Sequence, residues 1–330
     1  MIKEIGSEFW NIPTQDKDNL VFSDDTKWFI SGRAALDFII KDIKKKNNAK
    51  SVAMPSWCCD TMIKPFLRND IEVRFYPVTI KDNKLDININ VEADIVLIMN
   101  YFGYHQDISV NSNAIIIEDL THSIFTNSKH KADYYFGSLR KWAGFKTGGY
   151  ALICSDHSFN ENNEYYELRN KAMSLKEKYI NNEIATKEYR AIFEEAEEKL
   201  DVLIDYSGNE KDIYDARHLN IEFLKNKRRE NAFILLESLK EYAIFKNIEN
   251  DDCPLQFPIV VPNGKRDDLR RYLGSKNIYC PIHWPKSEYH KLDNDELFIY
   301  NNELSIVCDQ RYSIEEMKYV SKCIKEFLGC

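Results

Sequence analysis

The chain has 330 residues, of which 44% are hydrophobic and 30% are charged, a composition typical of a soluble globular protein with one large core or two domains. Its net charge of −8 argues against a nucleic-acid partner, because nucleic acids select a basic face. The eight cysteines contain no CxxC pair, so neither a metal site nor a disulfide framework is predicted. No apolar stretch is long enough to span a membrane, and the expected setting is the cytoplasm with reduced thiols.

The first 150 residues alternate between helix-like and strand-like segments. Ser31-Gly32-Arg33 opens a predicted helix, whose apolar residues recur on one face. Short apolar runs then follow one another, which is typical of buried strands in a mainly parallel sheet. These predicted strands cover residues 51–55, 73–78, 94–101, 114–118, 133–138 and 149–154.

The rest of the chain has a different pattern. Residues 160–205 are charged, rich in Glu, Lys and Tyr, and free of Pro and Gly, which predicts long amphipathic helices over the sheet or against a partner subunit. A helix after residue 220 leads to predicted strands at 256–261 and 278–282 and helices at 265–273 and from Ser313, where Ser313-Ile-Glu-Glu is a capping box. The pattern predicts a large α/β domain, residues 1–219, and a small C-terminal α+β domain, residues 220–330.

Three features of the larger domain favour one kind of ligand. Small residues after Ser31 leave backbone N–H groups at a helix N-terminus, which suits phosphate, although an ordinary serine cap has the same sequence. Asp119 ends a buried strand, where α/β proteins place their sites, although an acid there also caps turns. Lys141 and Lys146 follow a later strand in a glycine-containing turn. A phosphate cradle, a carboxylate for the ring nitrogen and a Schiff-base lysine, in this order, are what pyridoxal phosphate requires.

Five segments match, in order, the motifs of a known family. They read SGRAAL at 31–36, MPSW at 54–57, NYFGYHQD at 100–107, EDLTH at 118–122 and YCPIH at 279–283. On these motifs the chain resembles, over nearly its whole length, the DegT/DnrJ/EryC1/StrS sugar aminotransferases, a branch of the fold type I pyridoxal-phosphate enzymes. The resemblance implies the aspartate-aminotransferase-like fold, with a large, mainly parallel α/β/α sheet domain and a smaller α+β domain.

The same resemblance assigns the two catalytic residues. Family members place the Schiff-base lysine seven residues before a Gly-Gly pair, and Lys141 has this spacing to Gly148, whereas Lys146 lies only two residues before it. Lys146 is therefore expected to be a solvent-facing loop charge. Asp119 is expected to keep the pyridine nitrogen protonated.

Further residues are assigned to the cofactor and the substrate. The resemblance implies phosphate contacts from Gly32, Arg33 and Ala34, and places His122 near the phenolic oxygen of the cofactor. The family's phosphate-contacting serine falls at Phe136, so Ser138 is the expected replacement. The family's stacking aromatic falls at Cys59, so Trp57 is the expected replacement. For the substrate, His283 and Arg311 are the candidates, although a Pro-framed turn and an exposed arginine before a helix cap fit these positions too.

The implied activity is transfer of an amino group from an amino acid, with glutamate as the expected donor, to a keto group on a nucleotide-linked sugar or related small molecule, in polysaccharide biosynthesis. The same cofactor also supports lyase, dehydratase or decarboxylase reactions on an amino acid, and a non-catalytic relative would use the fold for binding alone. A homodimer with shared active sites is expected. Aromatic residues between 160 and 205 are expected at its interface: Tyr165, Tyr166, Tyr179, Tyr189 and Phe193.

Overall fold

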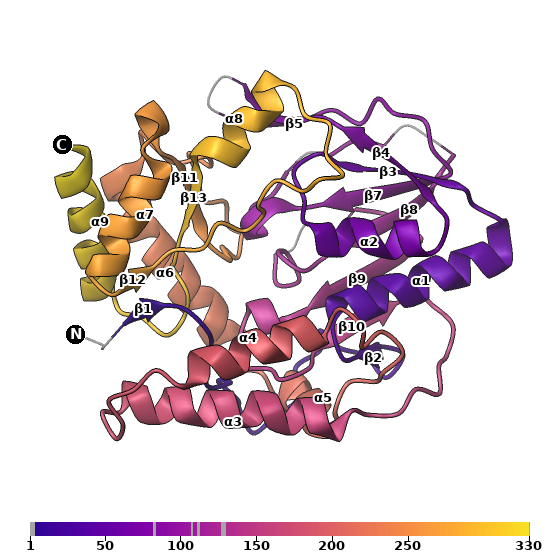
Figure 1. The fold of residues 1–330 in the computed structure, drawn as a ribbon, viewed down its shortest axis with the longest axis horizontal. Helices are drawn as coiled ribbons and strands as arrows, with labels where there is room; N and C mark the ends of the chain where they lie inside the picture. Colours follow the sequence, from indigo (N-terminus) through magenta and orange to yellow (C-terminus); the bar gives the residue numbers. More distant parts are fainter. Residues whose placement is uncertain (1–3, 82–83, 107, 111–112, 127–129, 330) are drawn as a thin grey trace.

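A computed structural model describes residues 4–81, 84–106, 108–110, 113–126 and 130–329. Within this part of the chain, a seven-stranded sheet forms the centre of a large unit (Figure 1). Its strand order is β2 (Lys27–Phe29), β10 (Gly149–Leu152), β9 (Tyr134–Ser138), β8 (Ile115–Asp119), β7 (Ile95–Met99), β3 (Ser51–Pro55) and β4 (Glu72–Tyr76). Strand β10 runs antiparallel to both of its neighbours, and the other neighbouring strands are parallel.

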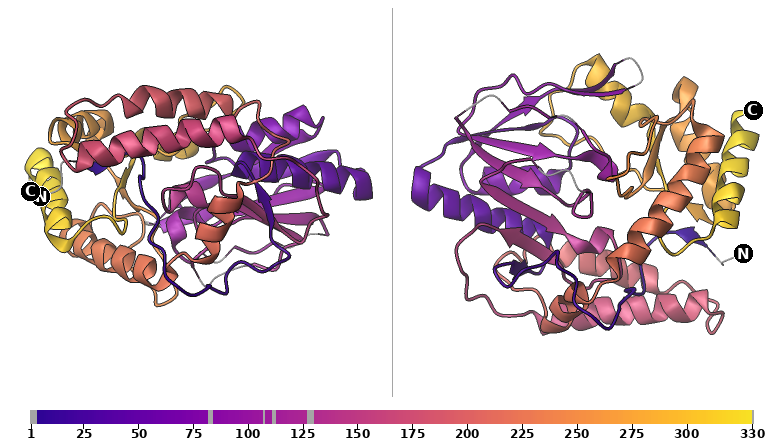
Figure 2. Two further views of the ribbon diagram at one scale, coloured as in Figure 1. Left: turned by 90° about the horizontal axis from the view of Figure 1, so that it is seen from below. Right: turned by 180° about the vertical axis from the view of Figure 1, so that it is seen from behind.

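Two helices cover one face of this sheet, and a cluster of apolar side chains from strands, loops and helices covers the other face. In the view of Figure 1, α1 (Gly32–Asn47) and α2 (Asp60–Arg68) lie in front of the strands, and α1 buries its apolar side against them. On the opposite face, Trp28 and Tyr150 pack with Ala216 of α5 (Glu210–Arg217) and Leu224 of α6 (Ile221–Leu239). Figure 2 shows α6 running from this face of the sheet to a second, smaller unit.

All six apolar runs predicted from the sequence form strands, with one correction at residues 73–78. Pro77 has no N–H to donate to a ladder, so β4 ends at Tyr76. Val78 then opens a separate strand, β5 (Val78–Lys81), which pairs antiparallel with β6 (Lys84–Ile87).

The small unit has its own core and includes the beginning of the chain. Strand β11 (Phe257–Val260) pairs with β13 (Glu303–Ile306), flanked by α6, α7 (Arg266–Ser275) and α9 (Ile314–Leu328), whose predicted capping box is present. Helix α8 (Asn294–Asn302) packs instead on β5, and its Ile299 and Tyr300 are buried in the core of the large unit. Strand β1 (Ile5–Gly6) pairs in parallel with β12 (Ile278–Tyr279), and Ile5 is buried in the core of the small unit. The domain boundary between residues 219 and 220 remains a prediction. Strand β1 precedes this boundary in the chain, but it packs with the small unit.

Two helices in the predicted amphipathic region, α3 (Asn163–Ile180) and α4 (Tyr189–Lys199), lie side by side (Figure 1). The aromatics expected at a subunit interface are all buried within this one chain: Tyr165, Tyr166, Tyr179, Tyr189 and Phe193. That expectation is wrong, because these side chains pack within the chain: Tyr179, Tyr189 and Phe193 between the two helices, and Tyr165 in the core of the large unit. No helix in the described part of the chain is long and apolar enough to cross a membrane.

Strand β10 approaches the start of α1 so closely that only glycine fits at position 149. A Cβ on Gly149 would lie 2.1 Å from the carbonyl oxygen of Ser31, whereas a Cβ on Gly274 in α7 would meet nothing within 4 Å. We therefore expect Gly149→Ala to lower the free energy of unfolding by about 1–3 kcal/mol, because backbone atoms must move apart. Gly274→Ala should leave stability unchanged or raise it by up to about 1 kcal/mol. Urea unfolding of both variants measures this, and equal effects would contradict the steric explanation.

Candidate active site

A cavity of about 750 Å³ opens between the large and small units, a size in the range of small-molecule sites. The large unit contributes the C-terminal ends of β7, β8 and β9, the first turn of α1, and the short 3-10 helix η2 (Leu139–Lys141). The small unit contributes the loop that follows β12, and α3 and α4 add charged side chains. The cavity therefore lies at the carboxyl edge of the parallel strands, where α/β proteins bind ligands.

The register of the sheet brings three of the lining residues into one row. Met99 of β7 is paired with Asp119 of β8, and Asp119 is paired with Phe136 of β9. Paired residues of neighbouring strands point to the same face, so all three side chains face the cavity. Ser138, two residues after Phe136, faces the same way.

The first turn of α1 supplies main-chain donors to this cavity. The N–H groups of Gly32 and Arg33 have no hydrogen-bond partner among the described residues, and both residues line the cavity beside Ser138. Ala34 differs, because its N–H donates to Oγ of the cap residue Ser31 (3.2 Å) and its side chain is buried away from the cavity. The expected phosphate contact from Ala34 is therefore corrected: the serine cap uses its N–H.

Asp119 lies at the floor of the site, and no cation of the described chain forms an ion pair with its carboxylate. One of its oxygens accepts the N–H of Thr121 (2.7 Å), and the Thr121 side chain adds a hydrogen bond. Burial raises the pKa of Asp119 to about 6, with the neighbouring Glu118 adding to the rise and the Thr121 hydrogen bonds opposing it. Glu118 points to the opposite face, where Asn100 and His130 donate to it.

His122 is a neutral histidine at the cavity wall. The N–H of Phe102 donates to its Nδ1 (3.3 Å), so the proton resides on Nε2. Burial lowers the pKa of His122 well below its usual value, and nearby His283 and Lys141 lower it further. Its ring stacks on Trp284, with ring centroids 5.2 Å apart.

Trp57 does not reach the cavity, which corrects its expected role as the stacking residue. Its ring is 2% exposed and stacks on Tyr101, with centroids 4.9 Å apart. Trp284 contacts Trp57 edge-on and lines the cavity in its place. Cys59 also lines the cavity.

The two lysines of the turn have different environments. Lys141 is exposed and lines the cavity directly after β9. Lys146 is only 9% exposed, and its ammonium lies 3.9 Å from a carboxylate oxygen of Asp212 and over the ring of Tyr166. The expectation that Lys146 faces solvent is wrong, since the loop folds against α3 and α5.

The small unit contributes a hydrogen-bonded chain behind His283. Nδ1 of His283 lies 2.8 Å from Oγ of Ser305, which in turn donates to the carboxylate of Glu303. Burial lowers the pKa of His283 to about 3 and raises the pKa of Glu303 to about 8. His283 therefore lines the cavity as a neutral imidazole.

Arg311 lines the cavity, but all of its donor nitrogens are already engaged. Its guanidinium pairs with Asp309 (2.8 Å) and donates to the carbonyl oxygens of Ser7 and Glu8. The side chain is 4% exposed, so the alternative of an exposed arginine is also wrong. Arg311 is a tether for the N-terminal segment, and its role as a substrate-carboxylate ligand is corrected.

A charged cluster that the sequence did not reveal completes the wall. Glu197 of α4 pairs with Arg140 of η2 and lies 3.5 Å from Arg33 and 3.8 Å from Arg169 of α3. Burial opposes the shift, but Arg140, Arg169 and Lys141 lower the pKa of Glu197 to about 2. These residues meet only through the packing of α1, η2, α3 and α4, and no sequence motif marks them. Asp107, part of one sequence motif, lies outside the described residues.

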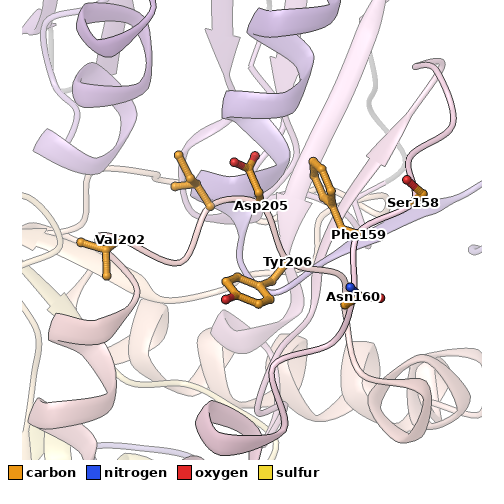
Figure 3. A pocket seen from close by; sticks show the side chains of 7 residues that line it. Ser158, Phe159, Asn160, Val202, Asp205 and Tyr206 are labelled. Atoms are coloured by element: carbon orange, nitrogen blue, oxygen red, sulfur yellow. The ribbon is translucent and has the colours of Figure 1, made fainter.

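A second hollow of about 450 Å³ lies on the surface between the segments that precede α3 and follow α4 (Figure 3). Phe159, Val202 and Tyr206 line it, and the carboxylate of Asp205 pairs with Lys41 (2.9 Å). This hollow offers no group of reactive side chains.

Comparison with known proteins yields structural matches alone: neither a family model nor a curated protein matches the sequence. A DegT DnrJ EryC1 StrS aminotransferase from Brucella abortus is 16% identical, with a TM-score of 0.62, over 92% of this chain and 86% of that one. PseC of Helicobacter pylori, an aminotransferase involved in the biosynthesis of pseudoaminic acid, is 14% identical, with a TM-score of 0.62, over 97% and 99%.

The chain has the fold of these aminotransferases. The fold expected from the sequence motifs is thus confirmed. A GDP-4-keto-6-deoxymannose-3-dehydratase, solved with a trapped PLP-glutamate geminal diamine, shares the fold at 15% identity and a TM-score of 0.62, over 91% of this chain and 88% of that one. One fold therefore includes proteins named for different reactions, and the reaction of this chain must be argued from its site.

The raised pKa of Asp119 predicts that the free energy of unfolding of the ligand-free protein falls as the pH rises. Because the folded-state pKa of about 6 exceeds the usual 3.8, the stability present at low pH is lost as the pH rises through 6. The loss at pH 8 is about 3 kcal/mol. We expect ligand-free Asp119→Asn to be more stable than the parent at pH 8, with the difference shrinking toward pH 4.

Urea unfolding from pH 4 to 8 measures this difference. Asp24→Asn, at a side chain that is 96% exposed, controls for the loss of one charge. A parallel pH dependence in the parent and Asp119→Asn would show that Asp119 is not destabilised by burial.

Proposed function

We propose that the chain is a pyridoxal-phosphate-dependent aminotransferase, with Lys141 and Asp119 as its catalytic residues. It moves an amino group from an amino acid, with glutamate as the expected donor, to a keto group on a nucleotide-linked sugar or related small molecule. The observation that carries the proposal is the meeting of Lys141, the buried carboxylate of Asp119 and the free N–H groups of α1 in one cavity.

The residues of the cavity fit the cofactor. The free N–H groups of Gly32 and Arg33, with the hydroxyl of Ser138, suit a phosphate group at a helix N-terminus. The carboxylate of Asp119, which has no ion-pair partner among the described residues, suits a cationic ring N–H, because a buried carboxylate without a counter-charge gains most from an opposite charge. The neutral His122 offers an Nε2–H donor to the same space.

When bound, pyridoxal phosphate supplies an electron sink for the carbanion formed at the substrate carbon. Asp119 keeps a proton at the ring nitrogen, and the amine of Lys141 takes a proton from the substrate carbon and returns it at the next step. Trp284, Met99 and Phe136 exclude water from one side of the cavity.

Glutamate as the amino donor is tested by what happens to it in the absence of an acceptor. An aminotransferase loaded with cofactor converts about one equivalent of glutamate per site to 2-oxoglutarate. Quantifying 2-oxoglutarate in a single turnover tests this, and an absence of oxoacid with retained cofactor would contradict glutamate as the donor.

The two lysines are distinguished by covalent attachment of the cofactor. We expect Lys141→Ala to abolish the visible absorbance of bound cofactor and the borohydride-trapped adduct, because no other lysine lines the cavity close to β9. Lys146→Ala should retain both and lose about 1–3 kcal/mol of stability, because Asp212 loses a buried counter-charge.

Mass spectrometry of the reduced protein locates the adduct. An adduct on Lys146, or its survival in Lys141→Ala, would overturn the assignment. The unfolding midpoint of Lys146→Ala separates a folding defect from a cofactor defect.

We infer a homodimer whose subunits share the active sites, as the resemblance implies. The free cysteines among the described residues accord with the proposed cytoplasmic setting, and an amino-sugar product accords with polysaccharide biosynthesis. Light scattering of the cofactor-loaded protein should give about twice the chain mass of 38.9 kDa. A mass near that of one chain, with cofactor bound and glutamate converted, would show that a single chain completes its site.

A further inference from the structure

Arg169 of α3 is buried in the cavity wall and has no hydrogen-bond partner among the described residues. The residue is 4% exposed, and its Nε is buried with no partner. The nearest carboxylate oxygen is that of Glu197 at 3.8 Å, and the guanidinium lies 4.9 Å from the ring centroid of Phe193. Burial lowers the pKa of Arg169, since desolvation disfavours the charged form.

Two other arginines of the interior, Arg228 and Arg311, have partners for their guanidinium nitrogens. Arg228, which is fully buried, donates to Gln310 and to the carbonyl oxygens of Pro254, Leu255 and Trp142. Arg311 uses all its nitrogens on Asp309, Ser7 and Glu8, as described above. Because buried charged groups are otherwise paired and hydrogen-bonded, the unmet donors of Arg169 indicate a missing ligand.

Its neighbours have unmet donors as well. Nε of Arg140 is buried without a partner, and so is the hydroxyl of Tyr165, which lies in the field of both arginines. Arg33, Arg140 and Arg169 surround the carboxylate of Glu197, so their spacing already accommodates one planar oxyanion. Two further acids are close: Asp201, paired with Arg33, and Glu8, which lies in the field of Arg140 and Arg169.

We propose that Arg169 and Arg140 form an oxyanion subsite of the cavity, with Glu197 as its internal counter-ion. The subsite takes a carboxylate or phosphate group of a substrate, and it rests on the proposed function in that the substrate binds beside Lys141. It is distinct from the helix α1 cradle, because its donors are guanidinium groups of α3 and η2, whereas the cradle offers the main-chain N–H groups of Gly32 and Arg33.

The test is calorimetric titration of the cofactor-loaded protein with glutarate, inorganic phosphate and diphosphate. Glutarate has the carboxylates of an amino-acid donor but no amino group, so binding occurs without reaction. Preferential binding of glutarate assigns the subsite to the amino donor, and preferential binding of diphosphate assigns it to a nucleotide-linked acceptor. Loading with cofactor fills the α1 cradle before the titration.

Two substitutions should shift anion affinity in opposite directions. We expect Arg169→Gln to weaken binding at least tenfold, because a charge-assisted hydrogen-bond donor is lost. Glu197→Gln should tighten it several-fold, since the competing carboxylate is neutralised. Arg217→Gln, on the surface helix α5, removes one positive charge outside the cavity and should leave affinity unchanged.

Thermal unfolding of the same variants separates a binding role from a structural one. The hydrogen bonds of Arg228 are part of the fold, so Arg228→Gln should lower the unfolding midpoint, whereas Arg169→Gln should leave it unchanged or raise it in the ligand-free protein. A loss of stability in Arg169→Gln as large as that in Arg228→Gln would overturn the proposal.

Unchanged anion affinity in Arg169→Gln would also overturn the proposal, as would anion binding that occurs only in cofactor-free protein and is abolished by pyridoxal phosphate. Failure of the proposed function has a different signature. In that case no cofactor adduct forms on Lys141, and the same titrations on ligand-free protein still decide whether Arg169 binds the anion.

Discussion

Parallel pairing of β7, β8 and β9 is the constraint on which the site depends. Parallel strands end at a common edge, and their register sets Met99, Asp119 and Phe136 side by side on one face. A shift of one residue in β8 would exchange Asp119 for Glu118 and turn the unpaired carboxylate away from the cavity. The apolar strand interiors, buried on both faces, hold this register with hydrophobic contacts rather than with polar groups of the site.

The site is completed only when the small unit lies against this edge. His283 and Trp284 come from the loop after β12, and β12 pairs with the N-terminal strand β1. Arg311 fixes the residues after β1 by donating to the carbonyl oxygens of Ser7 and Glu8. The two ends of the chain are thus tied together beside the cavity, which makes the shape of the site sensitive to the position of the whole small unit.

Electrostatics in the cavity follow from burial. His122 and His283 remain neutral because desolvation and the nearby Lys141 disfavour a second positive charge. Asp119, in contrast, keeps a high affinity for its proton until a cationic partner arrives. On the α3–α4 side the arginines outnumber the carboxylate they surround, so the two walls of the cavity differ in charge and in what they attract.

Local sequence patterns are enough to predict several strands, one helix start and three residues of the cavity. The apolar runs located the central strands, the capping box located the start of α9, and motif spacing located Asp119, Lys141 and His283, all of which line the cavity. These features depend on neighbours within a few residues or on spacing along the chain, which a sequence displays directly.

Tertiary packing alone decided how individual side chains are used. Lys146 is buried by Asp212 of α5, the donors of Arg311 are consumed by the N-terminal segment, and Arg169 meets Glu197 only because α3 packs on α4. Burial and ion pairing are properties of contacts between segments far apart in the chain, and no periodicity or spacing encodes which segments meet.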